Sequence, residues 1–144
     1  MLLPFITRSP STVFKLEKDF QAWIGTQIQE HHGMWWPYHK MSDQAVGKKP
    51  CDCFYVDEIG RTYFMELKMI DGYTFNINKM ESQQLEFLSR LSKMQMFDWY
   101  RQNPDDDHLL PLLLVYSKKL REWKCLHWIE IEKELLEKGS IKVF

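Results

Sequence analysis

The strongest constraint on the fold is a pair of β-forming segments, residues 52–57 and 62–68, joined by a short turn that contains a glycine. Aromatic and β-branched residues favour strands, and a glycine between two such runs is typical of a β-hairpin. Side chains alternate between the two faces of a strand. Glu66 and Lys68 therefore share one face of the second strand.

The register of this hairpin decides whether its charged residues meet. If Asp57 pairs with Arg61, then Asp52 lies opposite Glu66 and the two side chains share a face. A shift of one residue would turn Asp52 to the other face, and no feature of the sequence fixes the register. The meeting of Asp52 with Glu66 is therefore a conditional prediction.

The rest of the chain predicts an α/β fold. Apolar residues at helical spacing from Leu16 to Ile28 predict an amphipathic helix that begins after residues 9–12 and ends near Gly33. A second helix is expected from Asn78, as its cap, to about residue 100, with Gln84 on its buried stripe. Further strands are expected over residues 34–39, 111–117 and 123–129, and a last helix over residues 130–138. The predicted order is α-β-β-β-α-β-β-α, a mixed β-sheet flanked by helices.

Length and composition favour one domain over residues 1–144. The chain has 144 residues, of which 44% are hydrophobic and 27% charged, as in ordinary globular domains. No apolar run approaches the roughly 20 residues that a membrane-spanning helix needs. The first residues are too soon interrupted, by Pro4 and Arg8, to form a secretory signal. We therefore expect a cytoplasmic protein without a membrane partner.

Three cysteines, Cys51, Cys53 and Cys125, agree with a reducing compartment. Their odd number and the close spacing of the first two do not suit a disulfide framework. A zinc site is the alternative, but the paired CxxC spacing of structural zinc sites is absent. We interpret the three as small buried apolar side chains.

The net charge of −1 neither excludes nor supports a nucleic-acid partner. Nucleic-acid-binding domains often carry a clear basic excess, which neutralises phosphates. Here a DNA-binding surface would have to be local. Basic residues are indeed grouped at Lys48 and Lys49 and over residues 118–124.

Asp52, Glu66 and Lys68 are the residues that could carry chemistry. Carboxylates on neighbouring strands suit Mg²⁺, which prefers carboxylate oxygens and keeps several waters. A lysine within reach of the same ion could orient or help to deprotonate a water and stabilise charge on a phosphate. The alternative is an exposed ion pair of little consequence. The apolar residues on both sides of Glu66 favour the functional interpretation, because charges inside an apolar strand need a partner or a purpose.

Pro50 and Asp52, followed by Glu66 and Lys68, resemble the PD-(D/E)xK nuclease motif, with one residue inserted between the proline and the aspartate. Over residues 13–138 the chain resembles the small Holliday-junction resolvases, of the RecU type of bacteria and their phages and the Hjc type of archaea. In the RecU type the E-x-K strand is followed by a Ser/Thr-Phe pair and a helix that carries a glutamine.

Downstream residues extend this resemblance. Thr74 and Phe75 match the Ser/Thr-Phe pair, Gln84 matches the helix glutamine, and Ser117 ends the next strand as in that family. Archaeal-type resolvases also place a serine upstream of the aspartate, a part that Ser42 could play. The RecU-type stalk insertion has little room in the short segment of residues 40–50.

The resemblance implies a restriction-endonuclease-like fold and a DNA endonuclease that uses Mg²⁺ or Mn²⁺. It implies a homodimer that acts on branched DNA. Asp52 and Glu66 would bind the metal directly, with the Leu67 carbonyl as a third ligand. Lys68 would act on the water and the phosphate, and Gln84 would position Lys68 or the phosphate.

The resemblance also implies an acidic residue from the first helix as a metal ligand or a contact to metal-bound water. Glu17 matches best, followed by Asp19 and then by Glu30, which lies near the helix end. A solvated carboxylate on the helix face is the plain alternative for Glu17.

Two other functions fit the same residues. One is a restriction-type or repair-type nuclease that cuts flaps or ordinary duplex DNA. The other is a non-catalytic DNA-binding protein that keeps the same fold, although such proteins usually lose one residue of the Asp52, Glu66 and Lys68 set.

Overall fold

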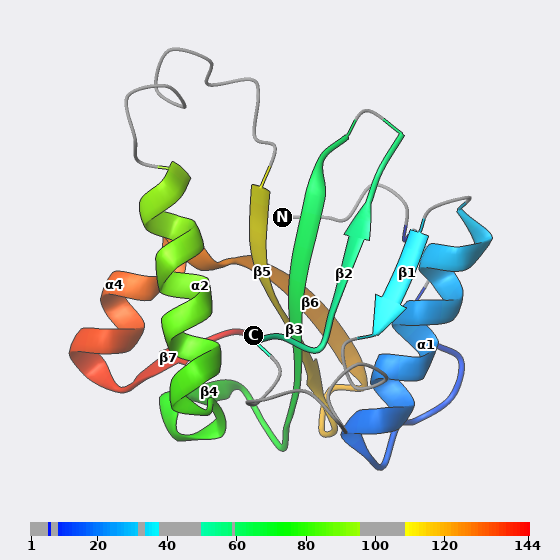
Figure 1. Ribbon diagram of the computed structural model, residues 1–144. Helices are drawn as coiled ribbons and strands as arrows, with labels where there is room; N and C mark the ends of the chain where they lie inside the picture. Colours follow the sequence, from blue (N-terminus) through cyan, green and yellow to red (C-terminus); the bar gives the residue numbers. More distant parts are fainter. Residues whose placement is uncertain (1–5, 7–8, 32–33, 38–49, 59, 96–108) are drawn as a thin grey trace.

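The computed structural model describes residues 6, 9–31, 34–37, 50–58, 60–95 and 109–144 (Figure 1). Over these residues it confirms the predicted α/β fold, a mixed sheet flanked by helices. The elements in chain order are α1 (Glu17–Glu30), β1 (Met34–Pro37), β2 (Cys53–Val56), β3 (Thr62–Ile70), β4 (Thr74–Asn76), the 3-10 turn η2 (Ile77–Lys79), α2 (Ser82–Gln95), β5 (Leu109–Ser117), β6 (Glu122–His127), α4 (Trp128–Lys138) and β7 (Ser140–Lys142).

The main sheet has the strand order β1-β2-β3-β5-β6. All neighbours are antiparallel except β3 and β5, which run parallel and are connected through α2. A parallel pair needs such a long crossover, and a helix usually supplies it. Two short strands, β4 and β7, form a second antiparallel sheet that the sequence did not predict.

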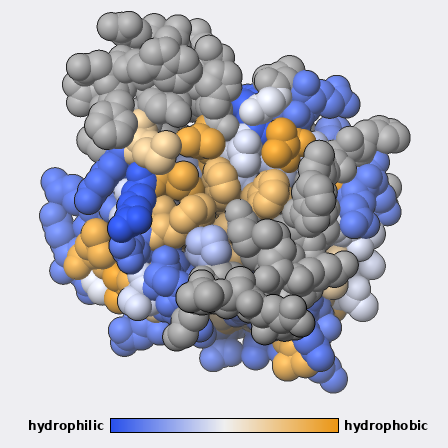
Figure 2. All heavy atoms as spheres, viewed as in Figure 1, coloured by the Kyte–Doolittle hydropathy of each residue, from blue (hydrophilic) through white to orange (hydrophobic). Residues whose placement is uncertain are grey.

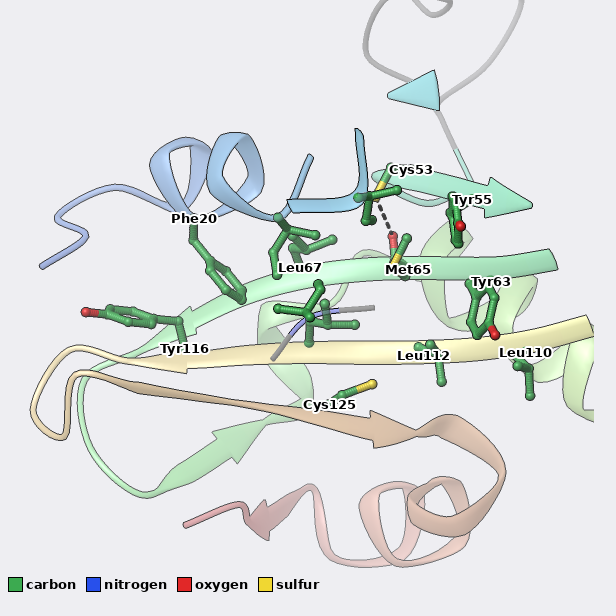
Figure 3. Close-up of a cluster of buried hydrophobic side chains, with 14 of the residues drawn as sticks. Phe20, Cys53, Tyr55, Tyr63, Met65, Leu67, Leu110, Leu112, Tyr116 and Cys125 are labelled. Carbon is green, nitrogen blue, oxygen red and sulfur yellow. Dashed lines mark hydrogen bonds between the residues drawn. The ribbon is translucent and has the colours of Figure 1, made fainter. Parts of the chain in front are cut away.

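Helix α1 covers one face of the main sheet (Figures 1 and 3). Its buried residues Phe20, Ile24 and Ile28 recur at four-residue spacing, so they form one stripe along the helix. They pack in one cluster with alternate residues of β3, among them Met65 and Leu67. Burial of each such side chain stabilises the fold by about 1.5–3 kcal/mol.

The start of this helix differs from the prediction. The helix begins at Glu17, and Leu16, expected on the buried stripe, is the N-cap residue with extended backbone and a 53% exposed side chain. Phe14 is buried instead, its ring 5.0 Å from that of Tyr116 and its N–H donating to the Tyr116 hydroxyl at 3.3 Å. The extended segment before α1 thus fills the space that helical spacing had assigned to Leu16.

Helices α2 and α4 cover the opposite face of the sheet. Leu88 of α2 and Trp128 and Leu135 of α4 are fully buried against Leu113 and Val115 of β5. Hydrophilic side chains predominate at the flanks of the face seen in Figure 2, and hydrophobic ones gather near its middle. No helix in the described ranges is long and apolar enough to cross a membrane.

The hairpin register on which the predicted site depends is confirmed. Cys53 pairs with Met65 in the β2–β3 ladder, and the N–H of Asp57 donates to the Arg61 carbonyl at 2.9 Å. The strand itself begins one residue later than predicted, at Cys53. One step beyond the ladder, the same register places Asp52 opposite Glu66.

Candidate active site

The site lies where β2 stops following β3. Within the described residues the β2–β3 ladder ends at the pair of Cys53 with Met65, whereas β3 continues to Ile70. The next backbone N–H on this side of β3 belongs to Leu67, and the Asp52 carboxylate accepts its hydrogen bond at 2.8 Å. The Asp52 side chain therefore accepts the hydrogen bond that a backbone carbonyl would accept if the ladder continued. This bond holds the Asp52 carboxylate beside the middle of β3.

Glu66 is the most enclosed charged residue of the site, with 0% of its surface exposed. Its Oε1 atom lies 3.1 Å from the Lys68 ammonium and accepts a hydrogen bond from the side-chain amide of Gln84 at 2.7 Å. Glu66 and Lys68 share a face because they are two residues apart on β3. Two donors therefore converge on one oxygen of a buried carboxylate.

Gln84 is held in one orientation by its place in the helix. It is the third residue of α2, and its amide oxygen accepts from the N–H of Glu81 at 2.9 Å, which is half of a capping box. With the amide oxygen occupied at the helix end, the NH₂ group points to Glu66. Gln84 therefore satisfies a backbone group and contacts the site at once.

The prediction that Asn78 caps this helix is wrong. Residues 77–79 form η2, and the Asn76 side chain accepts from the Asn78 N–H.

The second carboxylate oxygen of Glu66, Oε2, is buried without a hydrogen-bond partner among the described residues. Burial and the neighbouring Asp52 carboxylate both raise the pKa of Glu66, and Lys68 offsets this only in part. A buried, unsatisfied carboxylate oxygen is costly. A cation or a proton between the two carboxylates would remove that cost.

Glu17 reaches the same group of charges from the first turn of α1. Burial and then Asp52 raise its pKa, against the opposing effects of Lys68, the Met69 N–H and Lys79. The other first-helix candidates do not come close in the same way. Asp19 is exposed, and Glu30 is exposed at the far end of the helix, roughly 20 Å along its axis.

Both α1 and α2 begin near the C-terminal half of β3 (Figure 1). The electrostatic effect of Lys68 on Glu17 and the hydrogen bond of Gln84 to Glu66 indicate that both helix starts face the site. The start of a helix carries a partial positive charge. The two helices therefore partly offset the repulsion among the carboxylates and also favour an incoming anion.

Lys68 is 8% exposed and keeps its proton in this arrangement. Burial alone would lower the pKa of Lys68, but Glu66 and then Glu17 outweigh it, so the pKa is raised overall. A lysine in this state donates hydrogen bonds and stabilises negative charge. Lys68 does not remove a proton from water while the Glu66 and Glu17 carboxylates are ionised.

The oxygen donors of the site fit a hard divalent ion. No group of three or more His, Cys, Asp or Glu side chains arranged to hold a metal occurs among the described residues. The donors are the Asp52 and Glu66 carboxylates and the Leu67 carbonyl, which points to the same side of β3 as the Leu67 N–H. Mg²⁺ is commonly bound through one or two carboxylates and several waters, and Mn²⁺ accepts the same ligands. The unsatisfied Oε2 atom of Glu66 agrees with such an ion.

Other predicted residues have structural surroundings or lie outside the described part. Ser117 is buried, and its hydroxyl donates to the Gly72 carbonyl at 2.7 Å. Phe75 belongs to the core between the sheet and α2, and Thr74 is exposed on β4. Ser42 lies outside the described residues, as do Lys48 and Lys49.

Two residues near the site were not predicted. Cys51 is fully buried, and burial followed by Glu66 and Asp52 raises the pKa of its thiol, so it lies beside the carboxylates as an uncharged group. Lys79 is exposed on η2 and acts electrostatically on Glu17. No periodicity marks either residue, because both are placed by contacts between distant segments.

Comparison of the chain with protein-family models gives no match, and comparison with curated proteins gives none. The site itself combines two neighbouring carboxylates, a charged lysine and one buried oxygen without a partner among the described residues.

Proposed function

We propose that this protein is a metal-dependent DNA endonuclease that cuts phosphodiester bonds, with four-way junctions as its preferred substrate. The observation that carries the proposal is the buried Glu66 carboxylate, whose Oε2 atom lacks a hydrogen-bond partner among the described residues and whose pKa is raised by burial and by the nearby Asp52 carboxylate. Such a pair of carboxylates beside a charged lysine is suited to hold a divalent ion against a phosphate.

The residues of the chain have separable tasks in this mechanism. Asp52, fixed by the Leu67 N–H, and Glu66, fixed by Gln84 and Lys68, would hold Mg²⁺ or Mn²⁺. When bound, the ion would polarise a phosphate oxygen and lower the pKa of a water. The Lys68 ammonium would stabilise the negative charge that develops on the phosphate.

Glu17 would hold or accept a proton at the edge of the site. Its raised pKa makes its carboxylate a better proton acceptor than an ordinary surface glutamate. Its location at the start of α1 would also let it bind a water of the metal. This role depends on Glu17 alone among the first-helix acids, since Asp19 and Glu30 are exposed elsewhere.

The substrate rests on the resemblance to the small junction resolvases. A four-way junction has twofold symmetry, and a homodimer would present two equivalent sites to its two strands. Flap or ordinary duplex DNA is the competing substrate for the same chemistry. A DNA-binding protein without catalysis is the competing function.

One experiment separates these possibilities. Purified protein is incubated with labelled four-way junction, flap and matched linear duplex, each with Mg²⁺, Mn²⁺ or EDTA. We expect cleavage with either ion and none with EDTA, and the junction should be cut faster than the duplex. Preferential cutting of flap or duplex would reassign the substrate. Binding without cleavage under all conditions would favour the non-catalytic function.

Active-site variants test the residues in the same assay. Asp52→Asn and Lys68→Ala should abolish or greatly reduce cleavage. Glu30→Gln is the matched control, because it removes a carboxylate from the exposed far end of α1. Unchanged cleavage by Asp52→Asn or Lys68→Ala would overturn the catalytic assignment.

A further inference from the structure

The turn between β5 and β6, residues 118–121, lies directly beyond the end of β3. The N–H of Lys118 donates to the Ile70 carbonyl at 2.9 Å, and the N–H of Lys119 donates to the Asp71 carbonyl at 3.0 Å. Ile70 is two residues from Lys68, which corresponds to about 7 Å along a strand. The turn is therefore a near neighbour of the candidate active site.

This turn is held rigidly by hydrogen bonds on both sides. The Ser117 hydroxyl donates to the Gly72 carbonyl at 2.7 Å and accepts from the Leu120 N–H at 3.3 Å. The N–H of Arg121 donates to the Ser117 carbonyl at 2.8 Å. A charged group on such a turn is positioned relative to β3 with little loss of backbone entropy on binding.

Three exposed cations stand on this turn, at Lys118, Lys119 and Arg121. Lys118 lies 3.8 Å from the Asp71 carboxylate, but both side chains are exposed, and exposed pairs of this kind are weak. Lys119 lies over the ring of Tyr73, 5.2 Å from its centre. Because the Lys118–Asp71 pair is exposed, an incoming phosphate could replace Asp71 next to Lys118 without breaking a buried ion pair.

Arg121 has a backbone conformation that favours glycine. Its φ is 57°, and the other described residues with positive φ are Gly60 and Gly139. A residue with a side chain is uncommon in this region, and strain kept at one position is a reason to look for a use of its side chain. At Arg121 the side chain adds a third positive charge to the turn.

We propose that residues 118–121, here called the cationic turn, bind the DNA backbone next to the phosphate that is cut. The inference rests on the proposed nuclease function and names the surface that holds its substrate. DNA is the partner that fits best, because the turn carries three cations and its backbone is bonded to Ile70, two strand residues from the lysine assigned to the reacting phosphate. The turn would contact phosphates and carry no base preference.

Two variants of the full chain test this surface. Arg121→Gly removes one charge and relieves the positive φ, so its melting temperature should equal or exceed that of the wild type. The triple variant Lys118→Ala, Lys119→Ala, Arg121→Gly removes all three charges. The matched control is Lys93→Ala, Lys133→Ala, Lys138→Ala, whose lysines lie on α2 and α4. Helix α4 follows β6 at the end opposite to the cationic turn.

Binding to labelled four-way junction is measured in EDTA at about 50 to 200 mM salt. Each lost phosphate contact should reduce the slope of log affinity against log salt by about 0.9. The triple variant should therefore lose about 2 to 3 from the slope and bind at least about tenfold more weakly at low salt. The control variant should keep the wild-type slope. With Mg²⁺, cleavage by the triple variant should show a raised KM and little change in kcat.

The failure of this inference is distinguishable from failure of the proposed function. If the wild type cuts DNA and the triple variant keeps its affinity and slope, the cationic turn is excluded as a DNA surface and the nuclease remains. If the wild type binds DNA but cuts none with any ion, the nuclease function is excluded. The salt dependence of binding by the triple variant then still shows whether the cationic turn contacts DNA. Absence of DNA binding by the wild type would overturn both.

Discussion

The side-chain amide of Gln84 donates to the Oε1 atom of Glu66 at 2.7 Å, and this bond joins the first turn of α2 to the middle of β3. The same side chain caps α2 through the Glu81 N–H. Gln84 therefore contributes both to the start of the helix and to the orientation of the Glu66 carboxylate. A substitution at Gln84 affects stability and the site together, and two variants can separate the effects.

Gln84→Glu should keep the cap and damage the site, whereas Gln84→Ala should lose both. A glutamate can still accept from the Glu81 N–H, but it places a further carboxylate against Glu66. We expect Gln84→Ala to lower the free energy of unfolding by about 1–3 kcal/mol. Urea denaturation measures this, and Mn²⁺ titration measures the site. Equal Mn²⁺ affinity in Gln84→Glu and the wild type would contradict a positioning role.

Removing the charge of Glu66 should stabilise the metal-free protein. The buried Oε2 atom of Glu66 has no hydrogen-bond partner in the described part of the chain, and the ionised Glu66 carboxylate repels Asp52, so an amide at this position relieves both costs. We expect Glu66→Gln to raise the free energy of unfolding near pH 8 by on the order of 1–3 kcal/mol in EDTA. Asp57→Asn is the comparison, because Asp57 accepts bonds from Arg61 and Tyr63 and its loss should destabilise. A loss of stability in Glu66→Gln would show that its charge is well compensated.

The same residue predicts how stability depends on pH. The pKa of Glu66 is raised in the folded protein. The stability that Glu66 contributes is therefore fully present below its ordinary pKa of 4.5, and it is lost as the pH rises towards its pKa in the folded protein. Glu17 acts with the same sign. In EDTA the melting temperature should therefore fall as the pH rises from about 5 to 8. Mg²⁺, or the Glu66→Gln variant, should flatten this dependence. A rise of stability over that range in the wild type would contradict the assignment.

Tyr63 provides a pH test that is independent of the site. Its hydroxyl donates to the Asp57 carboxylate at 2.9 Å, and burial followed by this bond raises the pKa of Tyr63 to about 12. The contribution of Tyr63 to stability is thus present below about pH 10 and lost towards about pH 12. Tyr63→Phe should cost about 1–3 kcal/mol at neutral pH and weaken the pH dependence in that window. Denaturation curves at pH 7, 10 and 11 measure both effects.

Lys68 should act in the reaction and not in metal binding. Because its pKa is raised by Glu66 and Glu17, the ammonium partly neutralises the carboxylates and competes with a cation. Lys68→Ala should therefore keep or increase Mn²⁺ affinity while lowering the cleavage rate by about 10²- to 10⁴-fold. Calorimetric Mn²⁺ titration beside single-turnover cleavage distinguishes the two roles. Weakened Mn²⁺ binding with an unchanged cleavage rate at saturation would contradict this division.

The local part of the site was predictable from the sequence. The glycine-containing turn and the alternation of two short strands predicted a hairpin, and the Asp57–Arg61 pairing was the condition for Asp52 to meet Glu66. The structure has this pairing, which brings Asp52 to Glu66. The residues involved are close in the chain, so strand geometry relates them once the register is set. The helical stripe likewise predicted that Gln84 faces the sheet, where it is 5% exposed.

The non-local part was not predictable in the same way. The start of α1 depends on Phe14 packing against Tyr116, which lies about 100 residues later in the chain. The second sheet depends on β4 meeting β7, two three-residue strands that carry little pattern of their own. Glu17 was chosen by resemblance, and its nearness to Lys68 comes from packing of α1 on the sheet.

Cleavage of a labelled four-way junction by the wild type and by Glu66→Gln, each with Mg²⁺ or EDTA, is the most direct test of the proposed site. Circular dichroism and thermal melting check that the variant is folded, so that a loss of cleavage cannot be due to unfolding. We expect the variant to be at least as stable as the wild type. We predict that the wild type cuts the junction with Mg²⁺ and not with EDTA, and that the folded variant cuts it in neither. Equal cutting by the folded variant, or no cutting by the wild type with any divalent ion, would contradict a metal-dependent nuclease centred on Glu66.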